Sequence, residues 1–523
     1  MTVPILPVTF QAPGFKGLNS QLSSTALDSG WATELENAVF DQTGKITSRK
    51  GWEALTTSGS PGAHNIEQIH CYETETSTTV ICASNAKIYS GTTTLTDRTG
   101  TITAPAGNNW CFQNFNATKI VGWQLNHPPI VSTSGGNFAD IVVSDGGTIP
   151  DGNVCLAAFG RIFATKDDGY TVQYSALLDE TKWAVASGAG SFSTLNYWPK
   201  GKDYVTAMAV YEDKLVVFGQ RNILVYDSPE APGSLVLNDI IEGVGCIARD
   251  SVQSVGTDIL FLSETGIRSL RKSLITTKSP MQDISINIRD ELVVYATAGN
   301  ASKIRSCYNP VEGFYLLLIP SSTSPTIWCF DVKNLQQQYT DLPQAEQIRV
   351  SKWTGLGSCT AIAYGRDLTM YLGVRDGSSD GIISEYSGYI DGTENYTMKY
   401  KSPWMDLGNE QEGGSWYKIP KQATVTTVGG GSYQPTFAWA FDFERSEYTK
   451  TASVISSVTS AEYGVAEYGI GEYNASSREL ANSKMQLSHY GHFMRIGVSV
   501  PITGKEISIQ KIDLYMKRGR ISR

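Results

Sequence analysis

The 523-residue sequence contains no apolar run that approaches the roughly 18 residues of a membrane-spanning helix. Its opening residues, MTVPILPVTFQAPGFKG, lack a basic stretch followed by a continuous apolar one, so we expect no secretory signal peptide. Charged residues are scarce, at 18%, and the formal net charge is −9. Because affinity for phosphate groups depends on clustered Lys and Arg, this balance argues against a general nucleic-acid-binding protein.

The sequence also has little of what metal centres and catalytic sites need. None of its eight cysteines forms a CxxC pair, and several lie in apolar strand patterns such as IWCF, which favours buried, reduced thiols in a protein made in a reducing cytosol. His489 and His492 are the only close histidine pair, and no acidic or cysteine residue lies at ligand spacing from them. No Ser–His–Asp or paired-carboxylate constellation stands out. We therefore predict a protein without a catalytic, metal or cofactor site.

The sequence does contain a repeat: three apolar strands separated by polar turns recur seven times, and their third strands begin between 42 and 60 residues apart. This spacing is typical of propeller blades, which are about 40–50 residues long. In the clearest copy, Leu215–Phe218 and Ile223–Tyr226 flank a turn, and strands this apolar are covered on both faces. We predict an all-β protein with a β-propeller over residues 56–395, of seven blades, or of six because the first two copies are weak. A helix is predicted only over residues 283–294. The third strands are marked by Ile88–Tyr89, Ile130–Val131, Val172–Tyr174, Ile223–Tyr226, Ile267–Leu270, Ile327–Phe330 and Ile382–Tyr386.

The segments on either side of the repeats have a different pattern. Residues 1–55 contain a glycine- and serine-rich strap and a hairpin. Residues 396–523 return to alternating strands, which predicts an additional β-sandwich-like platform domain on which the strap packs. In the last strand, strict alternation would place Ile507 and Ile509 on one face and the apolar residues of Ile512–Met516 on the other.

The segment AEYGVAEYGIGEY carries an acid–aromatic pair with a period of five. Five matches neither helical nor strand periodicity, so the segment is predicted to form successive glycine-broken turns. Tyrosine supplies apolar area with a polar tip, which suits a contact with another subunit or an adaptor protein. The candidate interface residues here are Glu462, Tyr463, Glu467, Tyr468, Glu472 and Tyr473.

Two groups of basic residues, one near each end of the sequence, are either binding residues or solvated surface residues. Lys517, Arg518 and Arg520 near the C-terminal end either dock on an acidic partner or line a DNA path, or they form a solvated tail. The pair Arg49–Lys50 has the same alternatives, and Trp52 beside it is predicted to be a core anchor.

The segment TKDDGYTV is similar to the Asp-box turn of sialidase-type propellers, although Val172 replaces the aromatic residue of that motif. The Asp-box is itself a folding turn, so Asp167 and Asp168 favour a propeller rather than catalysis. The alternative function is a propeller glycosidase or a carbohydrate-binding tail protein. A glycosidase would need converging carboxylates near the propeller axis.

Four segments of the sequence carry a family resemblance. They are PGFKGLNSQ with LDSGWATELENAVFDQTGKITSRKGW, GRIFATKDDGYTVQYSALLDETKW, GCIARDSVQSVGTDILFLSETGIRSL and RIGVSVPITGKEISIQKIDLYMKRGR. In this order they resemble the tail nozzle proteins of short-tailed bacteriophages, also called tail tubular protein B or packaged-DNA stabilisation proteins.

The resemblance implies a structural role in the virion after synthesis in the host bacterial cytoplasm. It implies a homo-hexameric ring with an axial channel, in which the platform contacts the head-to-tail adaptor protein and the propellers form the distal nozzle. The channel would retain packaged phage DNA and open for its ejection, without sequence-specific binding and without a membrane span. A tail fibre or spike protein is a further expected partner.

Overall fold

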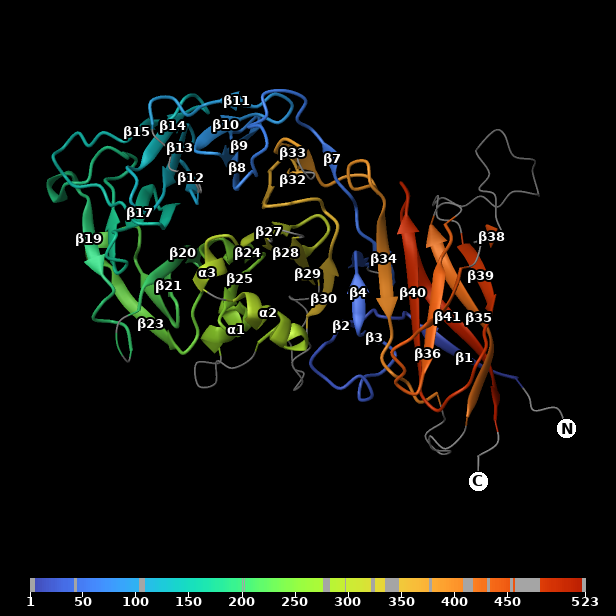
Figure 1. The fold of residues 1–523 in the computed structure, drawn as a ribbon. Coiled ribbons are helices and arrows are strands. Elements are labelled where there is room, and N and C mark those ends of the chain that lie inside the picture. Colours follow the sequence, from blue (N-terminus) through green and yellow to red (C-terminus); the bar gives the residue numbers. More distant parts are fainter. Residues whose placement is uncertain are drawn as a thin grey trace, which may run out of the picture.

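The computed structural model describes residues 5–41, 45–102, 109–199, 201, 203–275, 283–296, 298–320, 325–333, 348–375, 379–407, 417–429, 433–451, 455–456 and 480–519. Strands dominate this part of the chain, and the predicted fold class, a β-propeller with a β-sandwich platform, is confirmed (Figure 1). Among these residues no helix has the length and apolar character needed to cross a membrane. The helices are α1 (Leu270–Ile275), α2 (Arg289–Tyr295) and α3 (Ala298–Ala301), with single 3₁₀ turns η1 (Val185–Ser187), η2 (Pro232–Ser234), η3 (Arg249–Ser251) and η4 (Ile286–Ile288).

The first four blades are antiparallel sheets of four strands. Within each blade, the strand numbers increase from the innermost strand to the outermost. The second strand of each of these blades, and also the third strand of blade four, is mostly buried on both faces because neighbouring blades cover it, as the continuous apolar runs predict. Blade one has β8 (Gln68–Glu73), β9 (Thr78–Ser84), β10 (Lys87–Ser90) and β11 (Thr96–Asp97); blade two has β12 (Cys111–Phe115), β13 (Lys119–Trp123), β14 (Ile130–Thr133) and β15 (Ala139–Asp140); blade three has β16 (Cys155–Ala158), β17 (Arg161–Thr165), β18 (Thr171–Tyr174) and β19 (Gly190–Ser193); blade four has β20 (Val205–Tyr211), β21 (Lys214–Gly219), β22 (Asn222–Asp227) and β23 (Val236–Glu242).

The last three blades differ from the others at their outer edges. Blade five has three strands and continues into α1, and the predicted helix follows as η4 and α2, with Ile284, Ile288 and Leu292 buried. The innermost strands of neighbouring blades contact one another around the ring, except that β20 of blade four contacts the η3 turn that precedes blade five. The innermost strand of blade seven, β31, contacts β8, so the ring closes with seven blades. The strands are β24 (Gln253–Val255), β25 (Asp258–Ser263) and β26 (Gly266–Ser269) in blade five; β27 (Arg305–Asn309), β28 (Phe314–Ile319), β29 (Thr326–Asp331) and β30 (Arg349–Trp353) in blade six; and β31 (Ala361–Tyr364), β32 (Met370–Val374) and β33 (Ile382–Glu385) in blade seven.

A strand from the N-terminal segment completes blade seven. This strand, β7 (Glu53–Ala54), pairs with β33, so the beginning and the end of the propeller are joined in one sheet. Trp52 is buried beside it in the core between blades six and seven, as predicted. The ring is thereby closed by hydrogen bonds between segments more than 300 residues apart.

The platform is a sandwich of two sheets. Buried side chains from both, such as Val425 and Leu514 of one sheet and Phe437 and Val498 of the other, form a single hydrophobic cluster. One sheet contains β1 (Ile5–Gln11), β5 (Ala38–Phe40), β6 (Ile46–Ser48), β35 (Lys418–Gly429), β38 (Ile455–Ser456), β39 (Leu480–Gln486) and β41 (Ile507–Arg518), and the other contains β4 (Glu34–Glu36), β34 (Tyr396–Lys401), β36 (Thr436–Phe441), β37 (Tyr448–Thr451) and β40 (Met494–Ile502).

The strap links the propeller to the platform. Its short strands β2 (Gly17–Leu18) and β3 (Trp31–Ala32) pair with each other, and β4 lies between β30 of blade six and β34 of the platform (Figure 1). Because β4 pairs with a strand on each side, parallel to β30 and antiparallel to β34, a nine-stranded sheet runs without interruption from blade six into the platform.

The last strand departs from strict alternation. Thr426 lies opposite Lys511 while the next residue, Thr427, lies opposite Ile509, so Gln510 is an extra residue in β41. Such a β-bulge reverses which side chains face the core. The prediction that the apolar residues before and after this point lie on opposite faces is therefore wrong. One buried cluster contains Ile507, Ile509, Ile512, Leu514 and Met516.

Gly51 fixes the path of the strap against the loop that leads from blade seven to the platform. A Cβ at Gly51 would lie 1.8 Å from the carbonyl oxygen of Ile390, which accepts a hydrogen bond from the amide of Trp52. We expect Gly51→Ala to lower the free energy of unfolding by about 1–3 kcal/mol in urea titrations, because the backbone must move apart. Gly233, whose Cβ would meet open space, is the matched control, and equal stability of the two alanine variants would contradict this packing.

Candidate functional site at the propeller axis

A cavity of about 650 Å³ lies where the innermost strands of the blades converge. Side chains and backbone from β8, β12, β16, β20, β24, β27 and β31 line it, together with η3. In many propeller architectures the central channel is where ligands gain access. The groups at this axis therefore decide what the propeller can do chemically.

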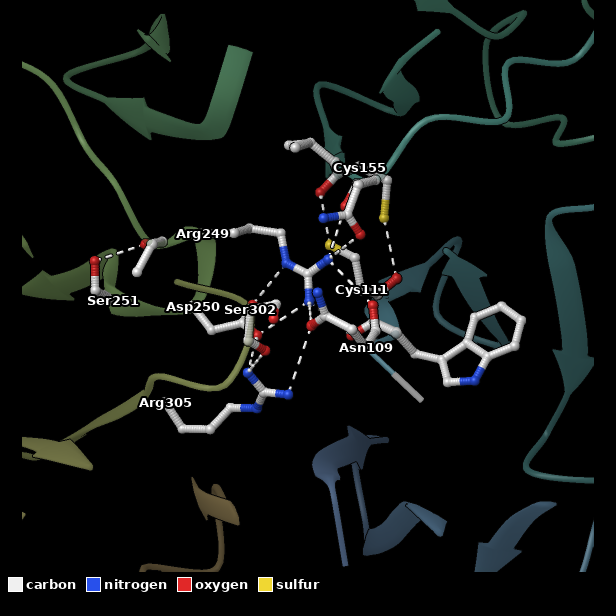
Figure 2. A network of polar contacts seen from close by, with 12 residues as sticks. Asn109, Cys111, Cys155, Arg249, Asp250, Ser251, Ser302 and Arg305 are labelled. Atoms are coloured by element: carbon white, nitrogen blue, oxygen red, sulfur yellow. Dashed lines mark hydrogen bonds and ion pairs between the residues drawn. The ribbon is translucent and has the colours of Figure 1, made fainter. Parts of the chain in front are cut away.

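Arg249, on the η3 turn between blades four and five, bridges three parts of the ring (Figure 2). Its Nη1 donates to the carbonyl oxygen of Asn153 at 2.7 Å, at the start of blade three. Its Nη2 donates to Asn109 Oδ1 at 2.9 Å and to the carbonyl oxygen of Trp110 at 3.0 Å, at the start of blade two. Its Nε donates to Asp250 Oδ1 at 2.7 Å. One guanidinium group thus connects the entry points of three blades.

Arg305, at the start of blade six, completes the bridge. Its Nη1 lies 3.1 Å from Asp250 Oδ2 and also donates to the carbonyl oxygen of Ser302. Its Nε donates to the carbonyl oxygen of Glu67, which precedes blade one. Asp250 thus lies between two guanidinium groups, and the network spans blades one, two, three, five and six across the axis (Figure 2).

The network is electrostatically satisfied. Burial alone would raise the pKa of Asp250, but Arg249 and Arg305 outweigh that effect and hold the pKa below its ordinary value. The excess positive charge is solvated by backbone carbonyl oxygens of three blades. A guanidinium group presents five N–H donors in a rigid fork, which suits this multiple bridging. The arrangement holds blades together and leaves few donors for a ligand.

Two cysteines flank the same network. Cys111 begins β12, Cys155 begins β16, and each thiol donates to the carbonyl oxygen of the other residue, at 3.3 and 3.2 Å. The hydrogen bond from Cys155, together with the charge of Arg249, lowers the pKa of Cys111 to about 7 against the effect of burial. Burial raises the pKa of Cys155.

A second polar cluster joins the strap, the propeller and the platform; we call it the junction clasp, formed by Arg49, Asn37, Thr354, Asp391 and Tyr396. Arg49 has no exposed surface, and its two terminal nitrogens donate to the two carboxylate oxygens of Asp391 at 2.8 and 2.7 Å. Its Nε donates to Asn37 Oδ1, its Nη2 also donates to the Thr354 carbonyl oxygen, and its guanidinium carbon lies 4.1 Å from the Tyr396 ring centroid.

The interpretation of Arg49 as a docking residue or part of a solvated surface is therefore wrong. Its partner Asp391 lies in the loop that leaves blade seven, 342 residues further along the chain. Lys50, the second residue of the basic pair, is half-exposed and lies 2.7 Å from Glu312 Oε1 of blade six.

Both rings of the close histidine pair pack against tyrosines. The ring of His489 stacks on Tyr448 with centroids 3.8 Å apart, and the ring of His492 lies 4.2 Å from that of Tyr417. Within the described residues, no group of three His, Cys, Asp or Glu side chains is placed to hold a metal ion. All eight cysteines are buried, unpaired thiols.

The turn that resembles an Asp-box joins β17 to β18. Asp168 Oδ1 accepts hydrogen bonds from the backbone amides of Tyr170 and Thr171, at 2.9 and 2.8 Å, and Oδ2 accepts one from the Thr171 hydroxyl at 2.6 Å. Asp167 is exposed. The carboxylate of Asp168 therefore fixes the turn.

Of the candidate interface residues, two have described positions. Lys517 and Arg518 end β41 in the platform, where β35 pairs with both and β1 pairs with Lys517, and both are half-buried. Arg520 lies outside the described residues, as do Glu462, Tyr463, Glu467, Tyr468, Glu472 and Tyr473.

Sequence reasoning missed the axial network and the junction clasp. Arg249, Asp250 and Arg305 share one signal, since each is a charged residue at the start of an innermost strand or in the turn before it. No sequence spacing connects them, because they meet only when the ring closes.

The sheets and their order define the molecule as a seven-bladed β-propeller joined to a β-sandwich. No family model and no curated protein matches the sequence. The WD40 propeller domain of Doa1 is similar at 11% identity, covering 64% of this chain and 97% of that one, with a TM-score of 0.32. The Neurospora crassa Pan2 WD40 domain is similar at 10% identity, covering 66% and 98%, with a TM-score of 0.35. The extracellular domain of BT4673 from B. thetaiotaomicron, assigned to a hybrid two-component system, is 9% identical over 62% of this chain and about half (51%) of its own length, with a TM-score of 0.23.

Proposed function

We propose that this chain is a structural subunit of a short bacteriophage tail, a nozzle protein that forms a hexameric ring around a DNA channel. The proposal starts from the resemblance of four sequence segments to that family. The structural observation that carries it is the bridged propeller axis. Arg249, Asp250 and Arg305 cross the centre of the ring, so DNA would not pass through a single propeller. The channel would lie between copies, and the propellers would form its wall.

The connection between the two domains supports the same role. The nine-stranded sheet through β4 and the junction clasp make the propeller and the platform one stiff unit. A subunit of this kind can carry load from an adaptor ring at the platform to the distal end of the tail. We place the head-to-tail adaptor protein at the platform and a tail fibre or spike protein as a further partner. The net charge of −9 per copy suits a wall along which phage DNA moves without being bound.

The axial cavity does not favour the rival function of a glycosidase. Glycosidases use two carboxylates, one of which has a raised pKa and donates a proton. Among the described residues lining the cavity, the carboxylates are Glu73 and Asp250. Asp250 is held ionised by two arginines, and Glu73 Oε1 accepts a hydrogen bond from the backbone amide of Arg366 at 2.9 Å. This arrangement supports a protein of the virion that acts through assembly.

Light scattering on the purified protein, together with assays for hydrolysis of host glycans, tests the proposal. We expect the mass of six copies under assembly conditions and no hydrolysis. A protein that stays monomeric in the presence of its adaptor and cleaves a glycan would overturn it.

Alanine at Asp167, Asp168, His489 or His492 is expected to leave tail assembly and infectivity near the wild-type level. Asp168 fixes a turn and the two histidines pack against tyrosines, so any effect at these three positions should be a modest loss of stability of about 0.5–2 kcal/mol. Asp167 is exposed, and its replacement should have little effect. A plaque assay on a phage that carries each variant checks this. Loss of a glycan-hydrolysing activity in any of them would contradict the structural role.

Replacing Tyr463, Tyr468 and Tyr473 together by alanine is expected to weaken ring or tail assembly. The sequence predicts glycine-broken turns for this segment, and three acid–aromatic pairs on such turns would not bury one another. Tyrosines at an interface contribute strongly to its stability. The measurement is the fraction of assembled particles by sedimentation, with the exposed Tyr490 changed to alanine as a control. Unchanged assembly of the triple variant would show that the repeat is only a surface loop.

A further inference from the structure

Cys111 and Cys155 face each other across the boundary between blades two and three. They occupy the same position, the first residue of the innermost strand, in consecutive blades. The reciprocal S–H···O contacts of 3.3 and 3.2 Å place each sulfur against the backbone of the other residue (Figure 2). Both residues are buried but line the axial cavity of about 650 Å³, which is the route by which a small molecule would reach them.

We propose that Cys111 and Cys155 form a redox pair that closes into an interblade disulfide when the protein meets a small disulfide oxidant. The thiolate of Cys111 attacks one sulfur of the oxidant and expels the other as a thiolate, which leaves a mixed disulfide on Cys111. The thiol of Cys155 loses its proton and attacks Cys111 Sγ, and the second half of the oxidant leaves as a thiolate. One small disulfide is thereby reduced to two thiols while two protein thiols are oxidised to one disulfide.

The other cysteines of the axis do not share these features. Cys71 and Cys307 also line the cavity, but burial raises the pKa of both, that of Cys71 to about 12, so neither supplies a thiolate near neutral pH. Cys111 lies beside the guanidinium of Arg249, whose positive charge favours the thiolate. Thiolate character and access to an oxidant therefore coincide at Cys111.

The disulfide would add a covalent link beside the arginine bridge. In a reducing cytosol the pair would remain as thiols while the chain folds and assembles. In a particle released into an oxidising medium, the link would form and fasten blade two to blade three. This consequence rests on the proposed function, whereas the reactivity of the pair does not.

The test uses the native full-length protein and oxidised glutathione as the oxidant. After treatment, free thiols are blocked, the protein is digested without reductant, and the peptides are identified by mass spectrometry. We expect a linked pair of peptides containing Cys111 and Cys155 that a reductant separates. The variant Cys155→Ser should instead carry glutathione on Cys111, and Cys246→Ser, changed at a buried cysteine elsewhere, should behave like the wild type.

Two outcomes would overturn the proposal. One is the absence of linked peptides from native protein under conditions that oxidise the unfolded chain. The other is oxidation spread evenly over the eight cysteines. The linked peptides from the wild-type protein test the proposal even where a variant folds poorly. Because the disulfide lies within a single chain, its formation is independent of whether hexameric rings form.

Discussion

Replacing Arg49 by alanine is expected to lower the free energy of unfolding by about 3–5 kcal/mol, because it leaves Asp391 as a buried carboxylate without its partner. The guanidinium group also donates to Asn37 Oδ1 and to the carbonyl oxygen of Thr354. Asn37 Oδ1 would keep the backbone amide of Thr354 as a donor, whereas the carbonyl oxygen of Thr354 would lose the donor that Arg49 supplies. Chemical denaturation followed by tryptophan fluorescence measures the effect. Arg49→Lys should recover only part of the loss, since an ammonium group cannot make the bidentate contact.

The matched control for Arg49 is the surface ion pair Lys16–Asp28, whose side chains are 53% and 57% exposed. Lys16→Ala should change the free energy of unfolding by no more than about 1 kcal/mol, because solvent screens exposed pairs. If Arg49→Ala proved as mild as Lys16→Ala, the junction clasp would not hold the propeller to the platform.

Asp250→Asn is expected to be the second severe substitution, at about 3 kcal/mol or more, because it keeps the shape of the side chain but leaves two buried guanidinium groups without an anion. Its pKa is lower in the folded protein than in the unfolded chain. The stabilisation from this carboxylate is therefore complete above the ordinary aspartate pKa of about 3.9 and is lost as the pH falls further. Unfolding curves at neutral and acidic pH should show the difference between wild type and Asp250→Asn shrinking below about pH 4.

The control for Asp250 is Asp167→Asn, a substitution at an exposed carboxylate of blade three. It should leave both the stability and its pH dependence close to wild type. An Asp250→Asn protein as stable as this control would mean that the axial network does not bind the blades together.

The propeller could be predicted from the sequence because its pattern is local. Each blade is a set of neighbouring strands joined by short turns, and strands such as Leu215–Phe218 are apolar on both faces because other blades cover them. The recurrence of the third strands predicts seven blades, with six as the alternative. The helical segment formed by η4 and α2 and the hairpin formed by β5 and β6 are local in the same sense.

Features that depend on distant parts of the chain could not be predicted. The pairing of β7 with β33 and the insertion of β4 between β30 and β34 join segments hundreds of residues apart. The bulge at Gln510 appears in the sequence only as two consecutive polar residues, Gln510 and Lys511, and the pairing of β41 with β35 is needed to recognise it. From the sequence alone, a charged residue such as Arg49 is predicted to lie at the surface, because charged side chains are seldom buried without a partner. Its partner Asp391 is known only from the structure.

Electron microscopy of the purified, assembled protein tests the central claim most directly. We expect rings of six subunits with a lumen between the subunits. Each propeller should be closed at its own axis by the network of Arg249, Asp250 and Arg305. Particles that remain single under assembly conditions, or a continuous open channel through each propeller, would contradict it.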